Sequence, residues 1–292
     1  MMYIYIVAAV CVFIILFFRL LGYIVIYTNF RRRISKKKYQ EDVSCFDHEG
    51  IDIERQYIES KAGRLQTYLF HRKQLNRNTR VVILVNGHGC FAADYKKVII
   101  SLVNEGFDIF NFDVSGTGES EGEFPGGYQQ WIADLKDVLH YVAPSYQTIS
   151  FLGHSIGGYA ASAILSIADV PIKSAAVVSA INSGTEYARF LYNSIPCRIT
   201  HQVYDAMRKY ETTRYGEYAD LTGLKGVNAF GGPVLILHST EDRMVPLKCS
   251  IAGYKDDITN PAATVKCLKK GDHYLLNDDG VVEEIVQFFE HQ

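Results

Sequence analysis

Residues 153–158 read Gly-His-Ser-Ile-Gly-Gly and place the pattern Gly-x-Ser-x-Gly around Ser155. A short apolar run, 148–152, precedes the pattern, and a helix-forming run, 159–165, follows it. A serine hydroxyl is a weak nucleophile at neutral pH, so it needs an uncovered position beside a base. A sharp turn from strand to helix gives that position, and the glycines admit backbone where a Cβ would clash. The pattern predicts a nucleophile at Ser155; a glycine-rich loop without chemistry is the alternative.

A second candidate feature follows the β-branched run 81–85, which is apolar on both faces and typical of a central parallel strand. The run ends in Asn-Gly-His-Gly-Cys at 86–90. The residue after the first glycine can turn its backbone N–H toward a developing oxyanion. We expect the N–H groups of His88 and of Ile156, just past the nucleophile, to form this oxyanion hole. His88 as the catalytic base is the alternative.

Three motifs occur in order, separated by helical patterns: Asn-Gly-His-Gly at 86–89, Asp-x-x-Gly-x-Gly-x-Ser at 113–120 and Gly-His-Ser-x-Gly-Gly at 153–158. Together they resemble the α/β-hydrolase superfamily, and most of all its lipase, esterase and peptidase branch, over about residues 54–290. The resemblance implies an α/β-hydrolase fold, with a mostly parallel central sheet, helices on both faces and a cap insertion. Asn86 departs from the pattern, because many members have His there; the change affects support of the loop more than the backbone donor.

In this superfamily the acid and the base of the triad follow the serine in the order Ser, Asp, His. Asp242 lies after the strand-like run 233–238 and three residues before Val-Pro, which is the position of the acid. Such an acid orients the base and stabilises the imidazolium that forms. Glu241 and Asp256 are lesser alternatives. His273 has the position of the general base, whereas His154, beside the nucleophile, is expected to support the turn by packing.

The elements that would position these residues alternate along the chain. Residues 54–59 and 65–71 are expected to form a hairpin around a turn at 61–64. Later strands are expected at 81–85, 107–112, 148–152, 173–180, 233–238 and 264–268, with helices at 94–104, 128–141 and after His273. The loop 113–120 is expected to be a scaffold without a part in the chemistry.

The region 181–230 has little strand periodicity but many aromatic residues. By its position in the superfamily, this region is the cap over the site. Aromatic side chains at helical spacing favour a core within the cap itself, and a pocket for an acyl chain is the alternative.

The charges are unevenly distributed along the 292 residues. Of the 30 basic residues, seven precede residue 39, whereas all 32 acidic residues follow residue 40. The rest of the chain therefore has 23 basic and 32 acidic residues, a net charge of −9. This balance argues against a body that binds nucleic acid.

The N-terminal segment is apolar or aromatic from residue 3 to 18, and the apolar run resumes after Arg19 as far as residue 27. As a helix it would span ~40 Å, which exceeds the ~30 Å hydrocarbon core of a bilayer. We therefore expect residues 1–30 to form an uncleaved membrane anchor that contacts the bilayer through residues 1–27, with Arg19 reaching an interface. A cleaved signal peptide and a buried core helix are the alternatives.

Basic residues follow the apolar segment at 31–33 and 36–38, and such residues stay on the cytoplasmic side of a membrane. The sequence thus predicts a single-pass protein with a linker at 31–53 and a hydrolase domain at 54–292 that faces the cytoplasm. We expect the basic cluster to set the orientation of the chain in the membrane; binding of anionic lipid head groups is a further role. Six cysteines without a Cys-x-x-Cys pair indicate reduced thiols, with disulfides or a metal site as the alternatives.

These features predict a serine hydrolase in which Ser155 attacks the acyl carbonyl of an ester or thioester, in a lipid or acylated substrate. His273 takes the proton of Ser155, and Asp242 orients His273. No metal or organic cofactor is required. An aminopeptidase or amidase is one alternative, since amide hydrolysis uses the same triad, and a catalytically silent, membrane-tethered scaffold is another.

Overall fold

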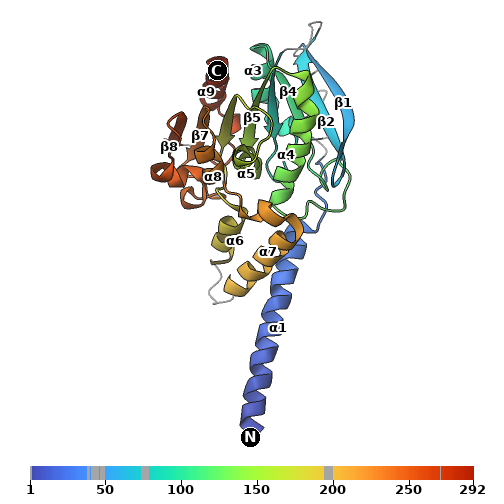
Figure 1. Ribbon diagram of the computed structural model, residues 1–292, viewed down its shortest axis with the longest axis vertical. Helices are drawn as coiled ribbons and strands as arrows, with labels where there is room; N and C mark the ends of the chain where they lie inside the picture. Colours follow the sequence, from blue (N-terminus) through green and yellow to red (C-terminus); the bar gives the residue numbers. More distant parts are fainter. Residues whose placement is uncertain are drawn as a thin grey trace.

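The computed structural model has an eight-stranded sheet at its centre (Figure 1). It describes residues 2–37, 40, 46, 50–73, 79–193, 200–269 and 271–292. Lys38 of the basic cluster and the cysteines Cys45 and Cys197 lie outside the described residues. All five residues predicted for the triad and the oxyanion hole lie within them.

The sheet has the strand order β1-β2-β4-β3-β5-β6-β7-β8. Its strands are β1 (Ile51–Ser60), β2 (Gly63–Arg72), β3 (Arg80–Val85), β4 (Asp108–Phe112), β5 (Thr148–His154), β6 (Ser174–Val178), β7 (Val234–Ser239) and β8 (Ala263–Leu268). The pairs β1/β2 and β2/β4 are antiparallel, and the other five pairs are parallel. The mostly parallel sheet confirms the predicted fold class, and the hairpin forms as predicted, although β1 begins three residues earlier than expected.

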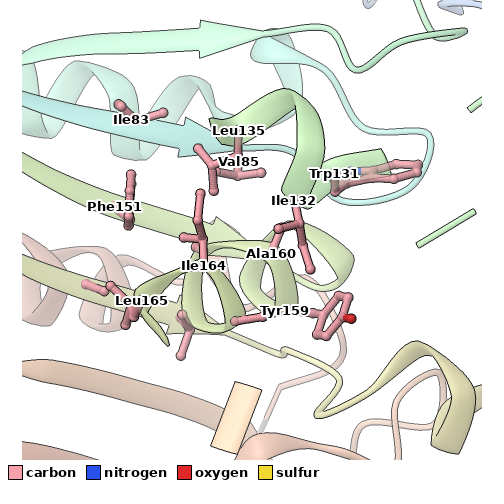
Figure 2. Packing of buried hydrophobic residues seen from close by; sticks show 14 of the residues in the cluster. Ile83, Val85, Trp131, Ile132, Leu135, Phe151, Tyr159, Ala160, Ile164 and Leu165 are labelled. Atoms are coloured by element: carbon pink, nitrogen blue, oxygen red, sulfur yellow. The ribbon is translucent and has the colours of Figure 1, made fainter. Parts of the chain in front are cut away.

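Helices cover both faces of the sheet (Figure 1). One face packs against α4 (Gln129–Val142), α5 (Ile156–Ala163) and α8 (Gly223–Ala229), and the other against α3 (Lys96–Asn104) and α9 (Asp279–Glu290). The strand β3 shows why both faces are apolar: Ile83 and Val85 enter the first core, whereas Val82 and Leu84 enter the second. Figure 2 shows the first core, where Ile83 and Val85 lie close to side chains of α4 and α5.

Parallel strands place their carboxyl ends at one edge of the sheet, where open α/β folds bind their ligands. The strands β3, β5, β7 and β8 all run parallel to their neighbours. The loops that follow them carry His88, Ser155, Asp242 and His273, in that order. Residues that are far apart in sequence are thereby brought to one edge.

The N-terminal helix α1 (Met2–Phe30) extends away from the rest of the molecule (Figure 1). Its described apolar side chains are exposed, among them Tyr3 at 80% and Phe13 at 70%. Searched over the described residues, the chain has no helix long and apolar enough to cross a bilayer. The predicted membrane span is therefore not supported by the structure. The side chain of Arg19, expected near an interface, lies outside the described side chains.

The described part of the predicted cap region contains the α-helices α6 (Gly184–Asn193), α7 (Thr200–Tyr215) and α8, with a short 3-10 helix at Gly216–Asp220. The helix α7 lies beside α1, and α6 packs against α7, below the sheet in Figure 1. The helix α8 instead packs against α5, where a Cβ at Gly226 would approach the carbonyl oxygen of Ser162 to 1.8 Å. The last part of the expected cap thus belongs to the layer of helices that covers the sheet.

Candidate active site

Ser155 occupies the turn between β5 and α5, with φ 56° and ψ −121°. A positive φ is rare for a residue with a side chain and indicates a locally strained backbone held by its surroundings. The N–H of Ser155 donates to the carbonyl of Val178 (2.9 Å), and its carbonyl accepts from the N–H of Tyr159 (3.1 Å). The neighbouring strand and the first turn of α5 therefore hold the serine in this conformation.

The glycines around Ser155 are required by the close approach of α5 to the sheet. A Cβ at Gly157 would lie 2.1 Å from the carbonyl oxygen of Val85, at the end of β3. A Cβ at Gly153 would lie 2.5 Å from the carbonyl oxygen of Gly157. Both distances are far below any van der Waals contact, so a larger residue at either position would displace the turn.

The three side chains predicted for the triad lie in one hydrogen-bonded line. Nε2 of His273 is 2.9 Å from Oγ of Ser155, and Nδ1 of His273 is 2.7 Å from Oδ2 of Asp242. An ionised carboxylate only accepts hydrogen bonds, so Nδ1 carries the proton and Nε2 is left to accept from the hydroxyl. The alternative acids Glu241 and Asp256 are both exposed. The line of contacts has the geometry needed to activate a serine hydroxyl.

Asp242 is held by its own loop after β7. Its Oδ1 accepts hydrogen bonds from the N–H groups of Met244 and Val245, both at 2.8 Å. Its side chain has no exposed area, and burial alone would raise the pKa of this carboxyl; the hydrogen bonds from His273 and Val245 outweigh burial and lower the pKa. Asp242 therefore stays ionised while it orients His273.

The two expected oxyanion donors, His88 and Ile156, both line the cavity beside Ser155. His88 lies in a tight turn in which the N–H of Cys90 donates to the carbonyl of Gly87 (3.2 Å). Burial lowers the pKa of His88, which keeps its imidazole neutral, and the ring stacks on Trp131 with centroids 6.3 Å apart. The base in contact with Ser155 is His273, not His88.

Asn86, which departs from the superfamily pattern, supports the turn that contains His88 through hydrogen bonds. Its Nδ2 donates to the carbonyl of Phe112 (3.0 Å), and its Oδ1 accepts from Nδ2 of Asn111 (2.7 Å). The indole N–H of Trp131 donates to the backbone carbonyl of Asn86 (2.9 Å). Asn86 is thus tied to β4 and α4 and fixes the end of β3.

His154 does more than the packing expected of it. Its Nε2 lies 3.0 Å from the carbonyl oxygen of His273, and its Nδ1 lies 3.1 Å from the hydroxyl of Tyr95. The same hydroxyl accepts from the N–H of Gly87 (2.8 Å). Because a carbonyl only accepts, Nε2 of His154 carries the proton, and the Tyr95 hydroxyl donates to Nδ1. Burial lowers the pKa of His154 to about 4, so the imidazole is neutral near pH 7.

The contacts of His154 and Tyr95 join the loop of His88 to the loop of the base. Sequence patterns gave no sign of Tyr95, because a tyrosine within an expected helix is read as a core residue. The position of His154 directly before the nucleophile was the one feature of the sequence that could have indicated its role in joining these loops.

Ser155 opens into a cavity of about 290 Å³. Apart from the site residues and their loops, its walls are apolar or aromatic: Tyr128, Ile181, Tyr187, Leu191, Met244 and Tyr274. No acidic side chain lines it among the described residues. Of the expected cap aromatics, Tyr187 lines the cavity, and its hydroxyl donates to the carbonyl of Met244 (2.9 Å). Others, such as Tyr218 and Phe230, pack against the core of the main domain instead.

Comparison with known proteins agrees with this architecture. Residues 76–208 match the family model of serine aminopeptidases, S33, and none of the curated proteins matches the chain. Among solved structures, the esterase Pf2001 of Pyrococcus furiosus has a TM-score of 0.65 at 17% identity, covering 89% of this chain and 97% of that one. The esterase Est1E of Butyrivibrio proteoclasticus, solved with ferulic acid, has a TM-score of 0.62 at 19% identity, covering 81% and 98%.

A third solved structure, the thioesterase domain from the curacin biosynthetic pathway, has a TM-score of 0.58 at 15% identity. The alignment covers 82% of this chain and 99% of that domain. At these identities the structural likeness shows the fold alone. The strand order, the turn at Ser155 and these comparisons together show that the chain has the α/β-hydrolase fold, and they support its place in the α/β-hydrolase superfamily.

Proposed function

We propose that the chain is a serine hydrolase that cleaves an acyl ester or thioester through Ser155, His273 and Asp242. One observation carries the proposal: the hydrogen-bonded line from Asp242 through His273 to a serine at positive φ, which opens into a cavity. The matched family and the esterases of the same fold support hydrolase chemistry.

The reaction proceeds through an acyl-enzyme. Nε2 of His273 accepts the proton of the Ser155 hydroxyl as Oγ attacks the acyl carbonyl, and Asp242 stabilises the imidazolium. The N–H groups of His88 and Ile156 donate to the oxyanion of the tetrahedral intermediate. His273 then returns the proton to the leaving alcohol or thiol, and water attacks the acyl-enzyme by the same route. Loss of one oxyanion donor costs about 10²–10³-fold in kcat.

The cavity favours an uncharged acyl group. Its apolar walls bury hydrocarbon well. The thioesterase domain and Est1E with bound ferulic acid, both of the same fold, are consistent with carboxylic ester or thioester substrates. An aminopeptidase must bind the α-ammonium group of a peptide, and a buried cation needs an opposite charge or hydrogen-bond acceptors. The described cavity residues include no acidic side chain, so they offer such an ammonium group no opposite charge.

Attachment to a bilayer through residues 1–27, with the catalytic domain on the cytoplasmic side, is a separate proposal from the apolar N-terminal sequence and the basic residues after it. The exposed apolar side chains of α1 are consistent with a nonpolar surrounding. Protease digestion of the expressed protein in sealed vesicles tests the orientation. Digestion of the catalytic domain only from the non-cytoplasmic side contradicts it.

Substrate profiling tests the proposed chemistry. The purified chain is assayed against p-nitrophenyl acyl esters of increasing length, acyl-thioesters and amino-acid p-nitroanilides, with Ser155→Ala as the matched control. We expect turnover of esters or thioesters that is lost in Ser155→Ala and little turnover of p-nitroanilides. Preferential hydrolysis of p-nitroanilides contradicts the ester assignment. No turnover of any substrate by the folded chain favours the silent scaffold.

A further inference from the structure

The described residues shortly after α1 are bound to the main domain. We call residues 33–37 together with Gln40 the N-terminal strap. The N–H of Ile34 donates to the carbonyl of Gly116 (3.1 Å), and its carbonyl accepts from the N–H of Gly118 (2.8 Å). The Arg33 guanidinium donates to three carbonyls of the same loop, those of Gly118, Ser120 and Gly122. The strap therefore pairs with the loop that follows β4.

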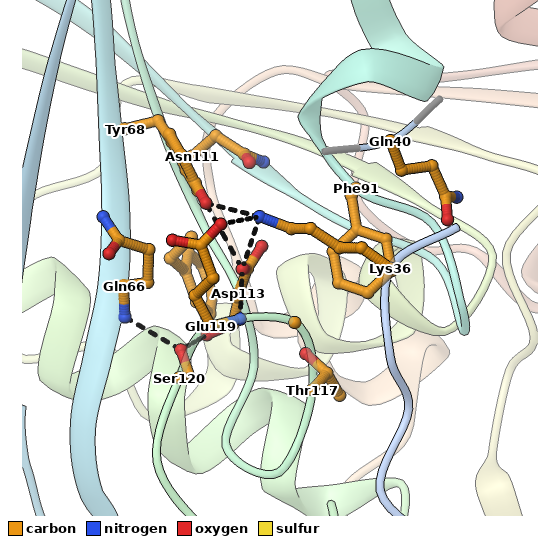
Figure 3. Close-up of polar contacts among 12 residues, drawn as sticks. Lys36, Gln40, Gln66, Tyr68, Phe91, Asn111, Asp113, Thr117, Glu119 and Ser120 are labelled. Atoms are coloured by element: carbon orange, nitrogen blue, oxygen red, sulfur yellow. Dashed lines mark hydrogen bonds and ion pairs between the residues drawn. The ribbon is translucent and has the colours of Figure 1, made fainter. Parts of the chain in front are cut away.

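A buried ion pair holds the middle of the strap (Figure 3). The Lys36 ammonium lies 3.0 Å from Oδ2 of Asp113, and the two side chains are 7% and 0% exposed. The ammonium also donates to the hydroxyl of Tyr68 (2.5 Å) and to Oε1 of Glu119 (3.2 Å), which uses all three of its donors. It lies 5.4 Å from the centre of the Phe91 ring.

The charge of Asp113 depends on this partner. Burial raises the pKa of its carboxyl, and the Lys36 ammonium opposes that rise. A buried carboxylate without a cation is strongly unfavourable, so the pair fixes the strap at one place on the domain.

The end of the strap reaches the loop of the expected oxyanion donor. Nε2 of Gln40 donates to the carbonyl of Gly89 (3.1 Å) and to Oδ2 of Asp94 (2.7 Å), while its Oε1 accepts from the N–H of Lys37 (2.8 Å). The same oxygen of Asp94 accepts from the N–H of Phe91 (2.8 Å). Gln40 is 3% exposed, so its partners would have no water to bond to if the side chain were removed, and the loss of these hydrogen bonds would be costly.

We propose that Gln40 of the N-terminal strap is a positioning residue of the active site, which fixes the Gly87–Asp94 loop and with it the N–H of His88. The carbonyl of Gly89 lies two peptide units after the N–H of His88, and both belong to the tight turn closed by the hydrogen bond from the N–H of Cys90 to the carbonyl of Gly87. The hydrogen bond from Gln40 therefore restrains the turn that holds the donor. An oxyanion donor works only when it is fixed before the charge develops. The basic residues Arg33 and Lys36 therefore act within the domain, besides any part in topology. The inference rests on the proposed serine-hydrolase function.

The test uses the full chain with Gln40→Glu, which keeps the shape of the side chain but removes both amide donors and adds a charge beside Asp94. Ser35→Ala, at an exposed position of the strap, is the matched control. For a p-nitrophenyl ester we expect Gln40→Glu to lower kcat by roughly 10–100-fold, at most the loss of one oxyanion donor, with KM within about 2-fold. The rate at which a fluorophosphonate labels Ser155 should fall by a similar factor.

A second measurement does not depend on activity. Hydrogen–deuterium exchange of peptides that cover residues 87–94 should be faster in Gln40→Glu than in Ser35→Ala, with peptides of β5 unchanged in both. Gln40→Ala repeats both measurements without the added charge, and a melting curve verifies that each variant is folded.

Two results overturn the inference: a kcat of folded Gln40→Glu and Gln40→Ala equal to that of the control, or unchanged exchange over 87–94. Failure of the proposed function is distinct, because the wild-type chain itself would then resist labelling at Ser155. In that case the exchange experiment still decides whether the strap holds the loop.

Discussion

The carboxylate of Asp242 divides its two oxygens between two tasks. Oδ1 accepts from two backbone N–H groups of its own loop, and Oδ2 accepts from Nδ1 of His273. The first set of bonds fixes the carboxylate, and the second fixes the tautomer of the imidazole. An asparagine at this position could still accept the two backbone hydrogen bonds, but its amide nitrogen could not accept the hydrogen bond from Nδ1 of His273.

Asp242→Asn is therefore expected to lower kcat by about 10³–10⁴-fold while the protein stays folded, because His273 is held in the wrong tautomer. Steady-state kinetics with an ester substrate measure the loss. Glu241→Gln, at the exposed neighbouring position, is the control and should keep kcat within about 2-fold, as expected for surface substitutions. Equal effects of the two variants would reject Asp242 as the acid.

Tyr95 tests the contacts that join the two catalytic loops. Tyr95→Phe leaves the buried N–H of Gly87 and Nδ1 of His154 without their hydroxyl partner, so we expect a loss of about 1–3 kcal/mol in the free energy of unfolding. Urea denaturation measures this change. Tyr141→Phe removes an exposed hydroxyl that accepts from Gln56 and should shift the free energy by less than about 0.5 kcal/mol. A Tyr95→Phe protein as stable as Tyr141→Phe contradicts the described network.

At the scale of elements, α7 carries a buried carboxyl toward the main domain. Glu211 is 1% exposed and lies near Tyr159 of α5 and Gln129 of α4. Burial raises its pKa from 4.5 to about 7. In the unfolded chain this carboxyl loses its proton at a lower pH than in the folded protein. Stability therefore falls as the pH rises from about 4.5 to about 7.

Glu211→Gln is expected to remove this part of the pH dependence and to stabilise the protein at pH 8 more than at pH 5. The difference should be of order 1–3 kcal/mol, given that one pKa unit corresponds to about 1.4 kcal/mol. Urea denaturation of both proteins at both pH values measures it. Asp134, with a pKa also raised to about 7 by burial, contributes equally to both proteins and cancels. Identical pH dependence of wild type and variant would show that Glu211 is not buried as described.

At the scale of the whole molecule, local patterns predicted the elements of the main domain. A run that is apolar on both faces marked β3, a short apolar run marked β5, and the four-residue spacing of Trp131 and Leu135 marked α4. The motif around Ser155, with the resemblance to a superfamily, was enough to name the three side chains that the structure brings into one line. These features were accessible because each depends on residues close together in the sequence or on a known order of motifs.

Other features depend on contacts between distant segments and were missed. Lys36 was interpreted as one of several basic residues that set topology, because nothing in its neighbourhood indicates a partner at Asp113, which is buried after β4. The helix α8 was assigned to the cap, because its packing against α5 depends on Gly226 and the backbone of Ser162 meeting in space. Burial of a charge by a remote segment has no signature in a single sequence.

The central claim is that Ser155 is an activated nucleophile. Its most direct test is mass spectrometry of the purified chain after reaction with a fluorophosphonate, with the adduct mapped by proteolysis. The account predicts one adduct, on Ser155, that is absent in Ser155→Ala and forms far more slowly in His273→Gln. A folded wild-type chain that gains no adduct, or gains it on another residue, contradicts the account.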